Sequence, residues 1–478
     1  MTPKAFEILA IYAFFITYTC AFPTAEVVER KANITQLTAL QNSGSDNIHT
    51  NVTSNVFDIP PGIFTSYVPL SAEPIMNDED DYVPYRSDVH DHFSWALLKQ
   101  ILLSTSAARS NNIKTDSVAS FFPEDTENVI FSPFSVKLVL ALLTEATGNG
   151  TRSRRQLLAT LGDIKAAENL RSFYRKTLAS LKKVNPHYTL HLETRLYTDA
   201  SIKPLPAYEE LLKSAYETPI EQLEFADGVA AAEQINSWIA RATEGRLQQL
   251  VTEEGVANSV MLLVNAIYFN GLWRRQFSES HSGVFFRTPR EQLKVSYMEL
   301  TDNFYFYQCN ELKARIVRLP YRGQKFSMFV ALPNNERSID SLLRRMQNEQ
   351  LKHMQWMMER TKFRVVMPKF KFGYKTDLKA ALCRLGVVDI FTDNAELTAM
   401  VANKDSRLLV SNILQKSGID VNEQGTEAYA ATEVEIVNRF GGSDEVEEFI
   451  VNRPFIFFIE EESTGNILFA GKVMNPTA

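Results

Sequence analysis

Cysteine is scarce in this sequence, with 3 residues in 478. A fold held together by a disulfide framework is therefore excluded. The 19 glycines and 19 prolines are too few for a collagen-like or low-complexity chain. Hydrophobic residues make up 45% and charged residues 22% of the chain, which is typical of an ordinary soluble globular protein. Stability must therefore come from a packed core.

Recognisable catalytic motifs are missing as well. None of the 7 histidines falls in a HExxH pattern or beside cysteines at a metal-binding spacing. The chain has no GxSxG elbow, no P-loop and no GxGxxG pattern. Ser132 could join a distant histidine in a catalytic triad, but its place before an apolar stretch favours a helix cap. We therefore expect a protein that is not an enzyme and needs no metal and no other cofactor.

One apolar run stands near the N-terminus, at residues 8–22. It is short for a membrane span, and Lys4 before it and Ala21 near its end are typical of a secretory signal. We interpret residues 1–21 as a cleaved signal peptide and expect a secreted protein of an extracellular, haemolymph-like fluid. An uncleaved signal anchor is the alternative.

Export has consequences for cysteines and asparagines. Signal cleavage would remove Cys20, and the sequence does not decide whether the remaining Cys309 and Cys383 pair. Asn-x-Ser/Thr sequons are glycosylation sites in exported proteins, although such sequons also arise by chance. The candidate glycosylation sites are Asn33, Asn51 and Asn149.

Charge is unevenly distributed along the chain. Residues 22–90 contain 3 Lys or Arg and 10 Asp or Glu, whereas residues 91–478 contain 46 of each. The first segment also has few periodic apolar residues, so we interpret 22–90 as an acidic, mostly disordered extension and 91–478 as one large domain. A neutral domain provides no overall field for nucleic acid, and we expect a monomer without a nucleic-acid or membrane partner.

Two charged stretches suggest modification or binding. Tyr82 directly follows four acidic residues, a context that tyrosine-sulfating enzymes favour; a solvated acidic linker is the alternative. Arg171, Arg175 and Lys182 fall on one face of an expected helix and could bind a sulfated glycosaminoglycan by releasing counterions. An amphipathic helix with a basic wet side is the alternative there.

The pattern of apolar residues predicts helices interspersed with strands. Helical spacing begins near His92, and residues 133–143 are apolar almost all round, which predicts a buried helix with Ser132 as its cap. The apolar stretches at 260–269, 326–332 and 362–372 are typical of strands, and 449–459 with 467–473 predict a C-terminal β-hairpin. Without a regular βαβ repeat, an α+β fold around a large sheet is favoured.

The segment from 426 to 437 alternates with a period of two. One face is small or apolar, at Thr426, Ala428, Ala430, Thr432, Val434 and Ile436, and the other carries the charges. This is the pattern of a strand buried on one side, yet the segment runs into the polar, glycine-containing residues 438–445. The segment is thus able to be either loop or strand, and a permanent edge strand with a polar turn is the alternative.

This segment resembles the hinge of the reactive-centre loop in inhibitory serpins, the serine protease inhibitor family. Other serpin signatures follow in family order through residues 91–478. They are Asn128 with residues 131–135, residues 235–238 with Thr243 and Gly245, residues 265–269 with Gly271, Trp273 and Phe277, and residues 368–370, 453–455 and 465–476. The resemblance implies three β-sheets, about nine helices and an exposed reactive-centre loop.

The resemblance also implies a mechanism. In serpins a protease cleaves the exposed loop, and the hinge then inserts into the central sheet as an extra strand while the protease is still attached. A bulky charge on the inward face would hinder insertion because it would be buried without a partner. Tyr429 departs from the usual small residue, but it falls on the outward face. The hinge residues are Glu423, Gly425, Thr426, Glu427, Ala428, Ala430, Ala431 and Thr432.

Serpin spacing places the reactive bond between Arg439 and Phe440, with Asn438 and Gly441 completing the loop tip. An arginine there suits trypsin-like proteases, whose specificity pocket is acidic. Such tips resemble those of arthropod serpins that restrain clip-domain proteases of melanisation and Toll signalling in innate immunity. A non-inhibitory serpin acting as carrier or chaperone is the alternative. Gln415 stands where many vertebrate serpins have a histidine beneath the central sheet, and its effect on sheet opening is left open.

Overall fold

The computed structural model describes residues 82–84, 92–110, 127–162, 167–278, 280–334, 339–346, 348–402, 408–425 and 446–478. The chain divides into two units, Met1–Glu79 and Asp80–Ala478, and every described residue belongs to the second. The predicted signal peptide and the sequons at Asn33 and Asn51 lie outside the described residues. Within the described part, no helix combines the length and apolarity that a membrane span requires.

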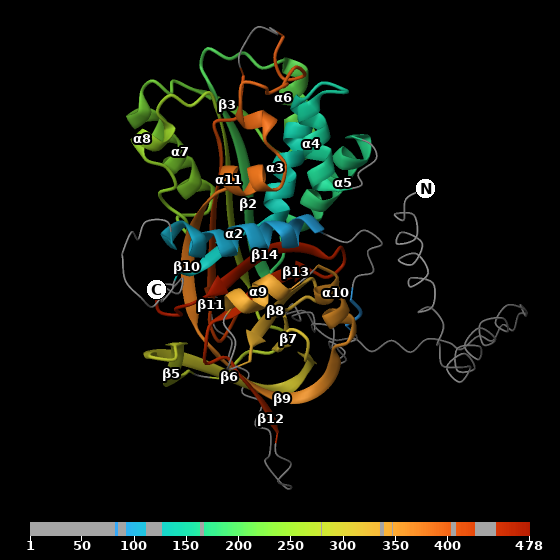
Figure 1. Cartoon of the computed structure of the whole chain (residues 1–478), viewed down its shortest axis with the longest axis vertical. Helices are drawn as coiled ribbons and strands as arrows, with labels where there is room; N and C mark the ends of the chain where they lie inside the picture. Colours follow the sequence, from blue (N-terminus) through green and yellow to red (C-terminus); the bar gives the residue numbers. More distant parts are fainter. Residues whose placement is uncertain are drawn as a thin grey trace, which may run out of the picture. The chain divides into compact units, whose positions relative to one another are not determined.

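The described residues contain ten α-helices and one short 3-10 helix (Figure 1). The helix expected near His92 and the buried helix after Ser132 are both confirmed. The helices are α2 (His92–Ser110), α3 (Pro133–Ala146), α4 (Arg152–Leu161), α5 (Ala167–Leu181), α6 (Pro206–Tyr216), α7 (Gly228–Ala242), α8 (Glu253–Val256), α9 (Ile339–Arg345), α10 (Asn348–Trp356), α11 (Lys379–Arg384) and η1 (Asp389–Phe391).

A five-stranded sheet has the strand order β10-β11-β4-β2-β3. Its members are β10 (Phe370–Asp377), β11 (Asn412–Val421), β4 (Met261–Gly271), β2 (Tyr188–Asp199) and β3 (Ile220–Leu223). β11 and β4 run parallel, from Asn412 opposite Leu262 to Ile419 opposite Phe269. β10 and β2, on either side of this pair, are antiparallel to their neighbours in it. The middle of the sheet is therefore a parallel pair between antiparallel strands.

Both faces of this sheet are covered. Leu262 and Val264 of β4 join a cluster with Ile235 and Trp238 of α7, whereas Leu263 enters the main core, to which α3 also belongs. Alternate residues of a strand point to opposite faces, so the nearly continuous apolar run of β4 follows from burial on both sides. Figure 1 shows α7 and α3 on opposite sides of the long strands.

The second sheet has nine strands. With it the described strands form two sheets, whereas three were expected. Its order is β1-β14-β13-β8-β7-β6-β9-β12, with β5 paired to β6. Because β6 is one strand of 19 residues that pairs with β5, β9 and β7, the described strands form two hydrogen-bonded sheets. The members are β1 (Val129–Phe131), β5 (His281–Thr288), β6 (Glu291–Cys309), β7 (Ala314–Pro320), β8 (Phe326–Pro333), β9 (Glu359–Pro368), β12 (Glu447–Ile450), β13 (Phe455–Glu461) and β14 (Asn466–Val473).

Candidate functional site

The start of the predicted hinge follows directly from β11. Glu423 and Gly425 are described, and the chain is described again from Val446, which leads into β12. β12 pairs in parallel with β9, with Glu447 opposite Phe363. The remaining predicted loop positions lie outside the described residues: Thr426, Glu427, Ala428, Ala430, Ala431, Thr432, Asn438, Arg439, Phe440 and Gly441.

Gly425 takes a backbone conformation that glycine alone adopts easily. Its φ is +134°, and a Cβ built there would lie 2.2 Å from the carbonyl oxygen of Gly271. Gly425 forms isolated β-bridges to Leu272, just beyond the end of β4, and to Asn422. A side chain at 425 would separate these backbones, so the glycine allows the hinge to approach the end of β4 closely.

Trp273 holds the same turn from the other side. Its backbone N–H donates to the carbonyl of Gln424 at 3.1 Å, and its indole Nε1 donates to the carbonyl of Asn422 at 2.9 Å. The indole ring is buried and stacks on Tyr321 with 4.4 Å between ring centroids and 12° between planes. A rigid aromatic side chain whose polar tip is satisfied thus anchors the start of the hinge.

Glu423 adds a charged contact to this anchor. Its carboxylate accepts a hydrogen bond from Lys369 Nζ at 2.9 Å, and its backbone carbonyl accepts one from Phe277 N at 2.9 Å. Burial alone raises the pKa of the Glu423 carboxyl, but hydrogen bonds from its own backbone N–H, from Lys369 and from Ser280 outweigh burial and leave that pKa below its ordinary value. The anion is therefore the form that the folded protein favours.

A buried polar network lies beneath the parallel pair of strands. The Gln415 side chain of β11 accepts a hydrogen bond from Ser132 N at 2.6 Å and donates one to Asn265 Oδ1 of β4 at 3.0 Å. Asn265 in turn donates to Thr194 Oγ1 of β2 at 2.9 Å. Ser132 also accepts from Ser135 N through its hydroxyl, which confirms its role as the cap of α3. Gln415 thus joins β11, β4 and the start of α3 below the sheet.

The arrangement of these strands has a mechanical consequence. A chain that leaves Gly425 and runs back along β11 would be antiparallel to both β11 and β4, because these two are parallel to each other. Separating them would exchange one parallel ladder for two antiparallel ladders, which are slightly more stable per residue. Separating the two strands would also break the hydrogen bond from Gln415 to Asn265. In the described part of the chain, no group of three or more His, Cys, Asp or Glu side chains is placed to hold a metal ion.

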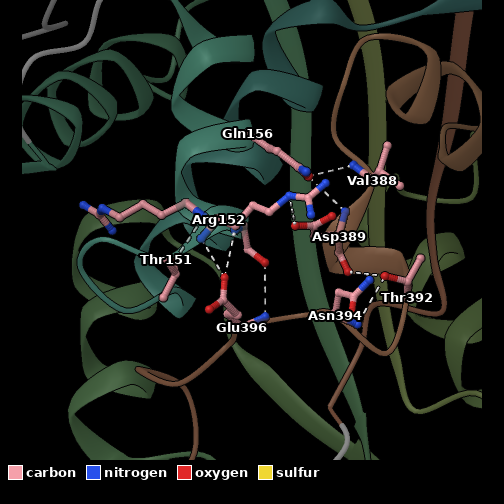
Figure 2. Close-up of polar contacts among 10 residues, drawn as sticks. Thr151, Arg152, Gln156, Val388, Asp389, Thr392, Asn394 and Glu396 are labelled. Carbon is pink, nitrogen blue, oxygen red and sulfur yellow. Dashed lines mark hydrogen bonds and ion pairs between the residues drawn. The ribbon is translucent and has the colours of Figure 1, made fainter.

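A polar junction fixes the segment that leads towards β11 (Figure 2). Glu396 Oε2 accepts hydrogen bonds from the backbone N–H of Arg152 at 2.6 Å and of Ser153 at 3.3 Å, at the start of α4. Arg152 Nε lies 3.1 Å from Asp389 Oδ2, and Gln156 Oε1 accepts from the backbone of Asp389 at 2.9 Å. These polar groups are partners of one another, so the junction is structural.

The predicted surface sites are placed as follows. Asn149 is exposed in the turn between α3 and α4, and Thr151 of its sequon caps α4 by accepting from Arg154 N at 3.3 Å. In the basic stretch, Arg171 makes two hydrogen bonds to Glu145, and Lys182 contacts Glu193 and Glu217. Arg175 is exposed. Two of the three predicted polyanion-binding side chains are thus engaged in ion pairs.

Cys309, Cys383 and Tyr82 all lie at least partly inside the protein. Cys309 is buried, Cys383 is half-buried, and both are free thiols. Tyr82 is buried against the nine-stranded sheet rather than solvated. Lys369 and Trp273 appeared in the sequence only within family signatures, and no local pattern indicated that they hold the hinge.

Comparisons with known proteins identify the family. The family model described as Serpin (serine protease inhibitor) matches residues 111–476. "Serine protease inhibitor 2" of Anopheles gambiae is 38% identical over 376 residues, which cover 77% of this chain and 92% of that protein. The chain belongs to the serpin family, and its mixed α+β architecture is the serpin fold.

Solved structures agree with this assignment. The structure of Serpin48, described as a highly specific serpin in the insect Tenebrio molitor, matches with a TM-score of 0.66 and 29% identity, over 81% of this chain and 100% of that one. Human thyroxine-binding globulin matches with a TM-score of 0.69 and 24% identity, over 81% of this chain and 99% of that one, and this likeness concerns the fold alone.

Proposed function

We propose that this serpin is a secreted inhibitor of trypsin-like serine proteases that acts as a suicide substrate. The target cleaves the chain after Arg439, and the hinge beginning at Gly425 inserts between β4 and β11 before the acyl-enzyme is hydrolysed. The observation that carries the proposal is the parallel pairing of β4 and β11 next to an anchored hinge, since one antiparallel strand fits between them. The small, uncharged residues on the inward hinge face support insertion.

The proposed target is a clip-domain protease of a melanisation or Toll cascade. Support comes from Arg439, whose guanidinium pairs with an acidic specificity pocket, and from the Asn-Arg-Phe-Gly tip. Matches to a mosquito protein and to a beetle serpin agree with an arthropod inhibitor. Secretion through residues 1–21 completes the proposal, and Asn149 is exposed for glycosylation. A sulfated glycosaminoglycan would have to compete for Arg171 and Lys182 with their carboxylate partners.

The test is to mix the purified protein with trypsin, separate the products on a denaturing gel and sequence the released C-terminal peptide. An SDS-stable complex together with a peptide beginning at Phe440 is the expected result. The control is Arg439→Ala, which should lose the complex with trypsin while keeping the thermal unfolding temperature of the unmodified chain. Clean cleavage without a complex would favour the non-inhibitory carrier, and a peptide beginning elsewhere would overturn the assignment of Arg439.

A further inference from the structure

A tyrosine that precedes the main domain lies on one face of the nine-stranded sheet. The centroid of the Tyr82 ring is 4.1 Å from Cζ of Arg318. The same ring meets Tyr305 edge-on at 5.4 Å and lies 6.2 Å from the ring of Phe329. Tyr82 is 8% exposed and its hydroxyl oxygen is buried, whereas the neighbouring Val83 is 70% exposed. Tyr82 is therefore a docked side chain in a segment whose next residue faces solvent.

The surface beneath Tyr82 is a row of side chains across three neighbouring strands. Tyr305 of β6 lies opposite Arg318 of β7, and Arg318 lies opposite Phe329 of β8. Directly opposite residues in adjacent strands share a face of the sheet, so the three side chains form one continuous surface. A charged centre between two aromatic side chains is a suitable receptor for the face and edge of a further ring.

Arg318 is a buried charge, and its guanidinium therefore needs contacts that replace water. Arg318 is 1% exposed, and its Nε and Nη2 donate to Glu462 Oε1 at 2.9 and 2.6 Å. A buried guanidinium needs a counter-charge and a replacement for its lost hydration. Glu462 provides the counter-charge, and the rings of Tyr82 and Tyr305, the latter 5.6 Å away, provide aromatic faces.

We propose that Arg318, Tyr305 and Phe329 form a docking pocket for a tyrosine-bearing peptide, and that Tyr82 occupies it within the same chain. The contact holds the described residues around Tyr82, 82–84, on the nine-stranded sheet. The ligand is an unmodified tyrosine side chain, because a sulfate on the Tyr82 hydroxyl would place a bulky charged group at an oxygen without exposed surface. Docking and sulfation of Tyr82 therefore exclude each other. This inference does not depend on protease inhibition.

The test uses the full chain with Tyr82→Ala, which vacates the pocket, and a fluorescein-labelled synthetic peptide of residues 76–84, in which Tyr82 is the only tyrosine. Fluorescence polarisation should show binding to the variant. The unmodified chain should bind the peptide at least about tenfold more weakly, because its tethered Tyr82 competes at a high effective concentration. The matched control is Val83→Ala in the full chain, which changes an exposed side chain and should behave like the unmodified protein.

Two further peptides define the ligand. A peptide with Tyr82→Ala and a peptide with sulfated Tyr82 should both fail to compete with the labelled peptide on the Tyr82→Ala chain. Equal binding of the labelled peptide to the variant and the unmodified chain, or competition by the peptide lacking tyrosine, would overturn the proposal.

A measurement on the unmodified protein covers the case in which Tyr82→Ala does not fold. Tyrosine nitration by tetranitromethane, followed by peptide mass spectrometry, should modify Tyr82 of the folded chain as slowly as the buried Tyr321, and at least about tenfold more slowly than the free peptide. Nitration of Tyr82 at the rate of the free peptide would contradict docking.

Discussion

At the scale of single residues, Gly425 shows how backbone conformation and packing combine at the hinge. Two independent penalties oppose any side chain there: a positive φ, and a Cβ that would lie 2.2 Å from the Gly271 carbonyl oxygen. Gly245 also has a positive φ, of +77°, but a Cβ there meets nothing within 4 Å. Gly425 therefore has a steric penalty, in addition to its positive φ, that Gly245 lacks.

We predict that Gly425→Ala lowers the urea midpoint of unfolding more than Gly245→Ala does. Both variants should lose at least about 1 kcal/mol because alanine disfavours a positive φ. Gly425→Ala should lose about a further 1–3 kcal/mol, because the added methyl group pushes the hinge away from the end of β4. Equal losses in the two variants would mean that the backbone at 425 relaxes without cost.

The Glu423 carboxylate makes the anchor of the hinge sensitive to acid. Its pKa in the folded protein lies below the ordinary value of 4.5, so its contribution to stability is complete above that value and is lost as the pH falls through the folded-state pKa. Because the partner Lys369 is about a third exposed, screening limits this contribution to about 1 kcal/mol or less.

We predict that Glu423→Gln lowers the urea midpoint by a constant amount between about pH 8 and about pH 6, and that the difference from the unmodified chain shrinks below about pH 4.5. Lys369→Gln should produce a similar loss at neutral pH. The double variant should lose clearly less than the sum of the two, since both changes remove one shared contact. Strict additivity would show that the two side chains do not act as a pair.

At the scale of elements, β11 is held to its neighbours by more than its own ladder. The buried Gln415 amide both accepts and donates, so it bridges Ser132 N and Asn265 Oδ1 without a change of protonation state. A histidine in the same place would accept from Ser132 N only when its ring is neutral, and its ordinary pKa lies near 6.5. Glutamine should therefore hold the sheet closed independently of pH in the physiological range.

We predict that Gln415→His makes the thermal unfolding temperature fall between about pH 7.5 and about pH 5.5, in a range where the unmodified chain changes much less. Burial and the need for a neutral acceptor lower the histidine pKa in the folded state, so its contribution is present above that pKa and lost below it. Gln415→Leu is the control: it should lose about 1–3 kcal/mol at every pH, because it leaves the buried Ser132 N–H without an acceptor. A flat pH profile for Gln415→His would contradict this account of the network.

The elements that the sequence predicted are those whose cause is local. Ser132 and Pro133 mark the start of α3, and the turn at 463–466 joins β13 to β14, as their residue types indicate. The predicted strand over 449–459 was partly wrong, because the chain leaves β12 at Ile450 and begins β13 at Phe455 around Pro454. The contacts of the site were not predictable, since Gln415 and Ser132 lie 283 positions apart.

At the scale of the whole molecule, the proposed function depends on the relative rates of two competing steps. Insertion of the cleaved hinge between β4 and β11 competes with hydrolysis of the acyl-enzyme. Buried side chains cover both faces of β4. The inward side chains of a strand inserted beside β4 would therefore be buried as well. A charge on that face would be buried without a partner at a cost of several kcal/mol, which slows insertion and lets hydrolysis win.

We predict that Ala428→Glu is cleaved by trypsin after Arg439 but yields at least about tenfold less SDS-stable complex than the unmodified chain, because an uncompensated carboxylate would have to enter the sheet. Glutamate creates no new trypsin site, so the cleavage pattern stays readable. The matched control is Tyr429→Glu, which places the same charge on the neighbouring outward face and should keep most of the complex. The two variants have the same net charge and carry the new glutamate at adjacent positions. A difference between them therefore reports the direction of the side chain in the inserted strand. Equal complex yields from both variants would mean that the hinge does not enter the sheet in the register assigned to it.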